Sequence, residues 1–307
     1  MVQVAQSVEL EVWALPSEQR SLGRDALRRL LRNRLALISL FVVLALAMVA
    51  LLAPWIAPHD PNAQNCAVGT LRGPSPEHLL GTDNNCRDVL SRLIYGSRVS
   101  LAVGILSQIA VFFIAVPVGA MAALSGRLVD NLLMRFTDLV YAFPALLAII
   151  LLRQVLADAS VPGGSLTVII LAIALVDWVT VARLVRGEML SLREREFALA
   201  ARALGASPWR IALVHLLPNG LGPVMVALTF GVPLAIFAEA TLSFIGIGID
   251  PPTATWGAMV DSGYRAIFAA PMLVVYPALA ISLTVMAFTF LGDGLRDALD
   301  PRAARRL

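Results

Sequence analysis

Six long apolar runs constrain the fold of this chain more than any other feature of its sequence. A stretch of about 20 apolar residues is long enough to cross the hydrocarbon core of a bilayer as an α-helix. The first, second and sixth runs contain no ionisable residue and show no period-two alternation, which argues against a membrane β-barrel. We therefore expect an all-α membrane protein with six transmembrane helices. The runs span residues 35–57, 99–124, 132–152, 165–185, 220–247 and 271–292.

The composition agrees with a membrane protein, because 58% of the 307 residues are hydrophobic and only 15% are charged. Soluble domains have an apolar share of about 45 to 50%. The apolar stretch within 35–57 is longer than the roughly 7 to 15 residues of a signal-peptide core, and it follows a long polar leader. We interpret this run as a retained membrane anchor.

The third run, 132–152, is the weakest of the six. Arg135 and Asp138 lie in its first turns, and Pro144 interrupts it. Proline removes a backbone donor and crowds the preceding turn of a helix. We therefore expect a kinked or shortened span here.

The basic residues predict the orientation of the chain. All 24 are arginine, and the six-span arrangement places all but six of them on the side that carries both termini. By the positive-inside rule this side is cytoplasmic. The net charge of +3 then reflects membrane topology, and no nucleic-acid-binding pattern accompanies it. The six arginines on the other side are Arg72, Arg87, Arg92, Arg98, Arg153 and Arg265.

The cytoplasmic N-terminal segment, 1–34, includes leucines at helical spacing among the arginines of Ser17–Arg34. This pattern is typical of an interfacial amphipathic helix. A disordered basic leader is the alternative, because Gly23 weakens a helix. The residues after the last span, 293–307, are expected to form a cytoplasmic tail.

Both cysteines, Cys66 and Cys86, fall in the expected extracytoplasmic segment, 58–98. Disulfides form and persist on the oxidising side of a membrane. A disulfide between them is therefore expected, and two unpaired thiols are the alternative.

The longest inner connection, 186–219, predicts two helices joined by a tight turn. Gly205 suits a left-handed residue that ends the first helix, Ser207 suits an N-cap and Pro208 suits the first position of the next helix. We expect the second helix to run from about Pro208 to Leu217. Pro218 and Asn219 would break it before the fifth span. Its apolar side chains, available for a partner groove, are Trp209, Ile211, Val214 and Leu217.

This connection resembles the cytoplasmic EAA loop of ABC-importer membrane permeases. Two positions depart from the family pattern, because Leu199 stands where glutamate is frequent and His215 where isoleucine is common. Glu196 keeps an acidic group nearby. The positions that match are Ala200, Ala201, Gly205, Leu217 and Pro218.

Three further stretches are similar to the C-type permeases of dipeptide, oligopeptide and nickel importers. Cys86 departs from that pattern, since the family commonly has glycine at this position. The stretches read LAPWIAPHDPNAQ, GTDNNCRDVLSRLIYGSRVSLAVG and TLSFIGIGIDPPTATWGAMV.

The resemblance implies the type I ABC importer permease fold in a prokaryotic cytoplasmic membrane. It also implies a second permease, two ATP-binding subunits and an extracytoplasmic solute-binding protein as partners. The chain has no GxxxxGK[ST] phosphate loop, so ATP and Mg are expected to be used by the partner ATPases. No cofactor and no enzymatic activity are expected in this chain. The ATPase-docking residues implied are Glu196, Ala200, Ala201, Gly205, Ala206, Ser207, Pro208, Trp209, Arg210, Leu217 and Pro218.

Two carboxylates, Asp177 and Glu239, lie within the fourth and fifth expected spans. Ionisable groups at such positions are costly and often face a transport path. Hydrogen bonding to a neighbouring helix is the structural alternative. The three histidines, His59, His78 and His215, are far apart in sequence and fall on different sides of the membrane, so no metal site is expected.

The charged group Asp83, Arg87, Asp88 and Arg92 suggests either an outer surface for the binding protein or a solvated helix with internal ion pairs. The leading functional hypothesis is a subunit for uptake of dipeptides or oligopeptides. An importer of nickel or another small solute is the alternative within the same fold. An ATP-independent channel is the alternative of another class, and it would not need the docking connection.

Overall fold

The computed structural model describes residues 22–67 and 69–299, and within them every regular element is helical. An isolated bridge between Thr82 and Asp88 is the only β-type pairing in that part of the chain. The helices are α2 (Leu22–Arg32), α3 (Arg34–Leu51), α4 (Ala53–Ile56), α5 (Val89–Leu124), α6 (Arg127–Tyr141), α7 (Ala145–Asp158), α8 (Gly164–Arg193), α9 (Glu196–Ala203), α10 (Pro208–Ile211), the π-helix η1 (Ala212–Leu216), α11 (Leu217–Phe244), α12 (Trp256–Tyr264) and α13 (Met272–Leu299).

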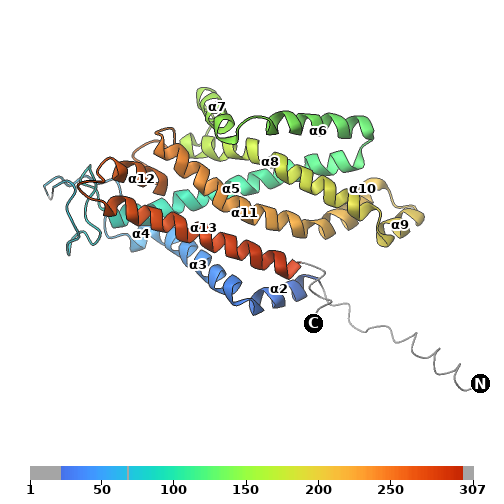
Figure 1. Cartoon of the computed structure of the whole chain (residues 1–307), viewed down its shortest axis with the longest axis horizontal. Helices are drawn as coiled ribbons and strands as arrows, with labels where there is room; N and C mark the ends of the chain where they lie inside the picture. Colours follow the sequence, from blue (N-terminus) through green and yellow to red (C-terminus); the bar gives the residue numbers. More distant parts are fainter. Residues whose placement is uncertain (1–21, 68, 300–307) are drawn as a thin grey trace, which may run out of the picture.

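Five helical segments are long and apolar enough to cross a membrane, and a bent pair brings the number to six. The five are α3, α5, α8, α10 to α11 taken together, and α13. They run side by side along the long axis of the molecule (Figure 1). The bent pair is α6 and α7, which meet at 95°. Pro144 is the N-cap of α7, so the interruption expected in the third run is confirmed.

Helices α5 and α8 pack together along most of their lengths and form the centre of the bundle. Their close approach depends on Gly119, since a Cβ atom there would lie 2.5 Å from the carbonyl oxygen of Ala182. Small residues allow the backbones of membrane helices to approach this closely. Close packing matters there because the hydrophobic effect does not drive helices together in lipid. Val111, Ala115 and Val185 fill the buried interface.

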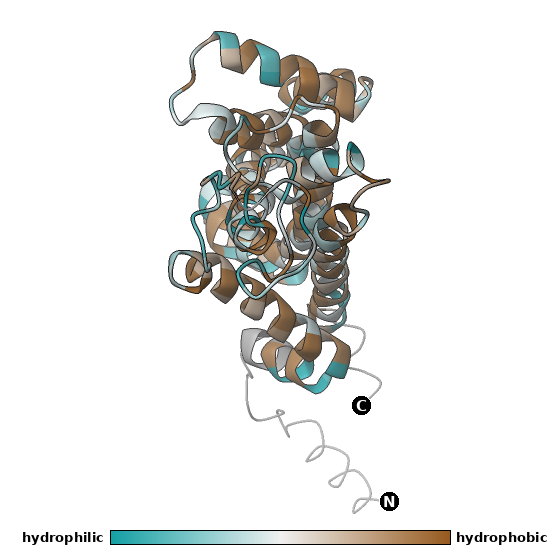
Figure 2. Cartoon of the chain, turned by 90° about the vertical axis from the view of Figure 1, so that its left-hand side faces the viewer, coloured by the Kyte–Doolittle hydropathy of each residue, from teal (hydrophilic) through white to brown (hydrophobic). Residues whose placement is uncertain are grey.

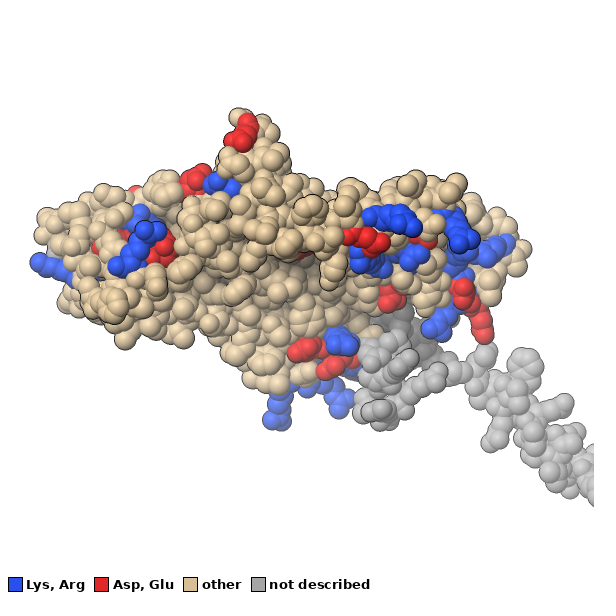
Figure 3. All heavy atoms as spheres, turned by 45° about the horizontal axis from the view of Figure 1, so that its top comes forward, with Lys and Arg blue, Asp and Glu red and all other residues tan. Residues whose placement is uncertain are grey.

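The outer faces of the bundle are apolar, as a bilayer requires. Large hydrophobic side chains such as Phe41, Phe113 and Leu279 are exposed on α3, α5 and α13. Brown hydrophobic residues accordingly cover much of the helical surface in Figure 2. On the face shown in Figure 3, most charged side chains gather toward the two ends of the long axis.

Helix α2, the connection formed by α9 and α10, and the end of α13 share one end of the molecule (Figure 1). Contacts confirm this arrangement, because Gly294 of α13 lies against Leu30 and Gly222 of α11 lies against Leu299. The helix expected before the first span is present over Leu22–Arg32. The remainder of Ser17–Arg34 at 17–21, and the tail at 300–307, lie outside the described residues.

The opposite end is built from the segment 57–88 and α12. The Cys66–Cys86 disulfide is present, which confirms the expected pairing. Helix α5 begins inside this end at Val89, ten residues before the expected start of the second span, and its N-cap is Asp88. With 36 residues α5 is about 54 Å long, so it extends well beyond a bilayer core of about 30 Å.

The four charged residues are buried, so the solvent-exposed position that both alternatives gave them is wrong. Arg87 Nε donates to Asp83 Oδ2 at 2.8 Å, and Arg92 Nε lies 3.6 Å from the same oxygen. Arg92 also donates to the Pro61 carbonyl at 3.0 Å. The internal pairs of the second alternative are therefore confirmed, but they are buried, and Asp83 and Arg87 precede α5.

Cys86 has a left-handed backbone with φ of 58°. We predict that a Cys66→Ser, Cys86→Ser double variant loses about 3 kcal/mol of stability in the segment before α5, as expected for a closed loop of about 20 residues. Replacing the second change by Cys86→Gly should restore about 1 kcal/mol, because glycine adopts φ > 0 without steric cost.

Limited proteolysis of the purified full-length variants would measure both effects, and thiol counting would test the disulfide itself. Two reactive thiols in unreduced, unfolded wild-type protein would contradict the pairing. Equal cleavage rates for the Cys86→Ser and Cys86→Gly double variants would contradict the backbone argument.

Candidate functional site

The connection between α8 and α11 is a helix, a left-handed turn and a second helix. Gly205 has φ of 84°, and its amide donates to the Arg202 carbonyl at 3.0 Å. The Ala206 amide donates to the Ala201 carbonyl at 3.1 Å. These two bonds form a Schellman motif, which satisfies carbonyls at the end of α9. The expected role of Gly205 as the turn residue is confirmed.

The second helix also begins as the sequence predicts. Ser207 is the N-cap of α10, and its hydroxyl accepts a hydrogen bond from the Arg210 amide at 3.3 Å. Pro208 occupies the first turn, where its missing N–H group leaves no intrahelical bond unmade. Ser207 and Pro208 therefore set where α10 begins, directly after the turn at Gly205.

The expected break at Pro218 and Asn219 is wrong, because α10 continues through η1 into α11. The Leu217 amide donates to the Ala212 carbonyl, five residues earlier, which is the bond of a π-turn. Proline in a regular α-helix would crowd the carbonyl four residues earlier. The wider turn accommodates Pro218, and the Asn219 side chain donates to the His215 carbonyl at 2.6 Å. The connection is thus rigidly joined to the fifth span.

One face of the connection is anchored in the bundle. Ala198 of α9 and Ile211 of α10 are buried among side chains of α5 and α8, together with Ala212 and Leu216. Ile211 was expected to be free for a partner, and this expectation is wrong because its side chain completes the core. Leu217 is half-buried against the same cluster.

The other face of the connection is exposed and partly apolar. Leu204, at the tip of the turn, is 89% exposed, and Trp209 and Val214 are also exposed, as expected for them. Glu196, Ala200 and Arg210 are exposed beside them, as are Gly205, Ser207, Pro208 and Pro218, whereas Ala201 and Ala206 are half-buried. An exposed apolar group of this kind at the tip of an anchored element is suited to contact with another protein.

Two arginine–aspartate pairs attach α6 to α8 near the connection. Arg186 binds Asp130 through two hydrogen bonds of 2.5 and 2.7 Å. Arg183 binds Asp138 at 2.8 Å and also lies over the ring of Tyr141 at 4.9 Å. From the sequence, Asp138 was only a charged residue that weakened the third apolar run as a membrane span. The charge pattern alone did not indicate its partner 45 residues away.

The two carboxylates within the spans have different surroundings. Asp177 lies near the middle of α8 and is half-buried. Glu239 lies five residues before the end of α11, is fully buried and accepts a hydrogen bond from Ser243 at 2.7 Å. The Ser243 bond is made within the same helix. A role in a transport path remains a prediction for both residues.

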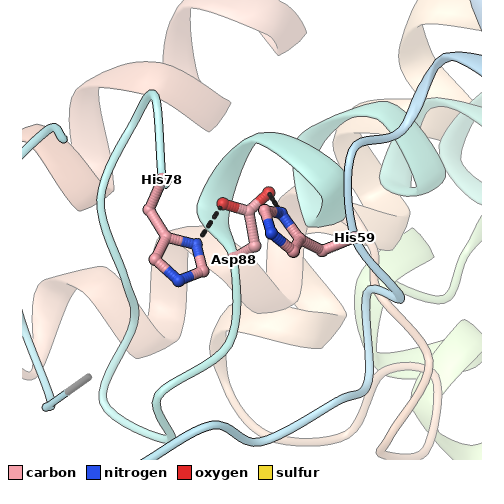
Figure 4. Close-up of side chains that lie close together, drawn as sticks. All are labelled: His59, His78 and Asp88. Carbon is pink, nitrogen blue, oxygen red and sulfur yellow. Dashed lines mark hydrogen bonds and ion pairs between the residues drawn. The ribbon is translucent and has the colours of Figure 1, made fainter. Parts of the chain in front are cut away.

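At the opposite end, His59 and His78 lie together, with ring centroids 4.8 Å apart (Figure 4). The expectation that the histidines are separated is therefore wrong for this pair, while His215 belongs to η1 at the other end. Asp88 lies between them, 2.9 Å from His78 Nδ1 and 3.8 Å from His59 Nδ1. Burial raises the pKa of Asp88, but hydrogen bonds from Ser91 and His78 outweigh it and keep the pKa below its usual value.

The fold and the anchored connection define a multispan membrane subunit. Two thirds of the chain superimpose on a chain of the inward-facing MetNI methionine ABC transporter, with a TM-score of 0.58 and 19% identity. The match covers 68% of this chain and 96% of that chain. At this identity the match shows the fold, which is that of a type I ABC importer permease.

The family follows from the sequence comparisons. Residues 115–305 match the model of the binding-protein-dependent transport system inner membrane component, and residues 21–74 match the N-terminal TM domain of oligopeptide transport permease C. The chain belongs to the binding-protein-dependent transport system inner membrane component family.

Two relatives cover nearly the whole chain. The dipeptide transport system permease protein DppC of Bacillus subtilis is 41% identical over 93% of this chain and 87% of its own length. The oligopeptide transport system permease protein OppC of the same organism is 37% identical over 92% of this chain and 90% of its own length.

We predict that Gly205→Val destabilises the turn by about 1 to 2 kcal/mol, although a Cβ atom there would meet no neighbour. The destabilisation comes only from the backbone conformation. Gly205→Asn should therefore lower the stability of the turn by less than Gly205→Val, because asparagine tolerates φ > 0. Gly187→Ala is the matched control, since Gly187 has free space and helical geometry.

Hydrogen exchange of the backbone amides around Gly205 in the full-length protein would measure the loss of stability of the turn. A loss of 1 to 2 kcal/mol corresponds to exchange faster by roughly 5- to 30-fold. Exchange at the wild-type rate in Gly205→Val would contradict the left-handed turn.

Proposed function

We propose that this chain is the membrane-spanning permease subunit of an ATP-driven importer for dipeptides or oligopeptides. The observation that carries the proposal is the near-complete match to dipeptide and oligopeptide permeases. The anchored connection with its exposed tip supports a role in coupling. The proposed location is a prokaryotic cytoplasmic membrane, in agreement with the family description.

The proposed coupling to the ATPase depends on the rigid attachment of α9 and α10 to the spanning helices. An ATPase subunit that contacts Leu204 and Trp209 moves a turn whose inner face is packed on α5 and α8. Because α10 continues through η1 into α11, a displacement at the tip is transmitted along the fifth span. The Arg186–Asp130 pair carries it to α6. Rigid-body motion of this kind supports alternating access.

The proposed assembly contains a second permease, two ATP-binding subunits and an extracytoplasmic solute-binding protein. ATP and Mg act at the ATP-binding subunits in this assembly. The end with α2, α9 and α10 faces the cytoplasm, together with both termini. The positive-inside rule supports this orientation, because Arg202 of α9 and Arg210 of α10 belong to this end.

The sharpest test is peptide uptake by the complete complex in proteoliposomes. ATP-dependent accumulation of a labelled dipeptide is expected, with no flux through this chain alone. Leu204→Asp should lower uptake and ATPase co-purification together, because the exposed leucine at the tip is replaced by a charge. Phe268→Asp, at a fully exposed position in the opposite end, is the matched control for ATPase co-purification.

Two results would contradict the proposal. ATP-independent flux from this chain alone would indicate a channel. Full coupling and full ATPase retention in Leu204→Asp would show that the connection is not the docking element. Uptake of nickel in place of peptides would keep the transport class and change the substrate.

The proposed path role of Asp177 has its own test. We predict that Asp177→Asn alters the uptake rate or the range of peptides accepted, because a carboxylate at mid-span can hold a peptide ammonium group. Glu239→Gln serves as the comparison, since Glu239 is enclosed within the chain. Unchanged uptake and substrate range in a normally assembled Asp177→Asn complex would exclude the path role of Asp177.

A further inference from the structure

Three potential metal ligands from three separate segments converge at the outer end of the molecule. His59 follows α4, His78 belongs to the loop before α5, and Asp88 is the N-cap of α5 (Figure 4). One ligand atom from each lies within 4.8 Å of the others. We propose that these residues form a binding site for a divalent transition-metal ion, with Zn²⁺ as the preferred occupant.

The distances fit a zinc ion after small side-chain movements. Zinc binds histidine nitrogen and carboxylate oxygen at about 2.0 to 2.2 Å, so neighbouring ligand atoms of a tetrahedral site lie about 3.3 Å apart. His78 Nδ1 lies 2.9 Å from Asp88 Oδ1, and His59 Nδ1 lies 3.8 Å from the other oxygen, Asp88 Oδ2, so the two nitrogens flank the carboxylate at distances near this value. Two imidazoles and a carboxylate are also the donor types that zinc prefers.

The surroundings hold these ligands in position. The Ser91 amide donates to Asp88 Oδ2 at 2.7 Å, which leaves Asp88 Oδ1 on the side of His78. The Ser91 hydroxyl accepts a hydrogen bond from the His59 amide at 3.0 Å. One buried serine therefore fixes the carboxylate and the backbone of a ligand 32 residues away. Hydrogen-bonded supports of this kind orient metal ligands in proteins.

The site reaches solvent at His59. His78 and Asp88 are buried, whereas the His59 side chain is 40% exposed. His59 also lines an outer cavity of about 860 Å³, together with Tyr95 and Arg98. Water can therefore complete the coordination, and the ion can enter from solution. Bound zinc would join segment 57–62 and the loop before α5 to the start of α5, beside the Cys66–Cys86 disulfide.

The test uses the full-length protein in detergent, purified through a tag without histidine and stripped with a chelator. After equilibrium dialysis against Zn²⁺, metal analysis should find one ion per chain. His59→Gln removes one ligand and leaves its backbone bond to Ser91 in place. His215→Gln, a change of the histidine at the other end, is the matched control and should bind as the wild type does.

Mutating a residue that hydrogen-bonds to a metal ligand lowers metal affinity by about 10- to 100-fold. His59→Gln removes a direct ligand, so it should weaken zinc binding by at least about tenfold. Zinc should also slow proteolysis of the outer segment in the wild type and in His215→Gln, and a chelator should reverse this. Equal zinc binding by the wild type and His59→Gln would overturn the proposal. No retained zinc in the wild type would overturn it as well.

Discussion

The structure depends on one constraint, which is that backbone N–H and C=O groups inside a bilayer must be paired within the protein. The long apolar runs are consequently helical, and four of the prolines within them do not end a helix, whereas Pro144 separates α6 from α7 in the third run. Pro117, Pro223, Pro233 and Pro277 all lie inside spanning helices. Pro218 is accommodated by a π-turn and an asparagine side chain. This local solution makes the connection between α8 and α11 continuous with the fifth span.

Several charged residues of the described chain form ion pairs that join separate segments. Arg183 and Arg186 of α8 bind aspartates of α6 and hold that helix against α8. At the end that carries α12, Arg87 and Arg92 surround Asp83 in a buried network. An unpaired charge at these positions would leave a large desolvation cost, so each pair fixes the position of a segment relative to the bundle.

The end that carries α12 and the segment before α5 has little regular structure and is held by cross-links between distant segments. The disulfide, the carboxylate of Asp88 and the buried Trp256 each join residues that are separate in sequence. Trp256 Nε1 donates to the Leu93 carbonyl at 3.0 Å, and Gly96 leaves room for its ring. Cys86 combines two roles here, because it forms the disulfide at a backbone position that favours glycine.

The sequence by itself determined the features that depend on a short stretch of chain. Apolar length predicted the spans, Pro144 predicted the bend, and Gly205 with Ser207 predicted the turn, since each acts through its own backbone and nearest neighbours. Tertiary structure alone decided which charges are buried, that Ile211 faces the core, and that His59 and His78 meet at Asp88. Burial and pairing depend on segments that the chain brings together from afar, and no local pattern records those neighbours.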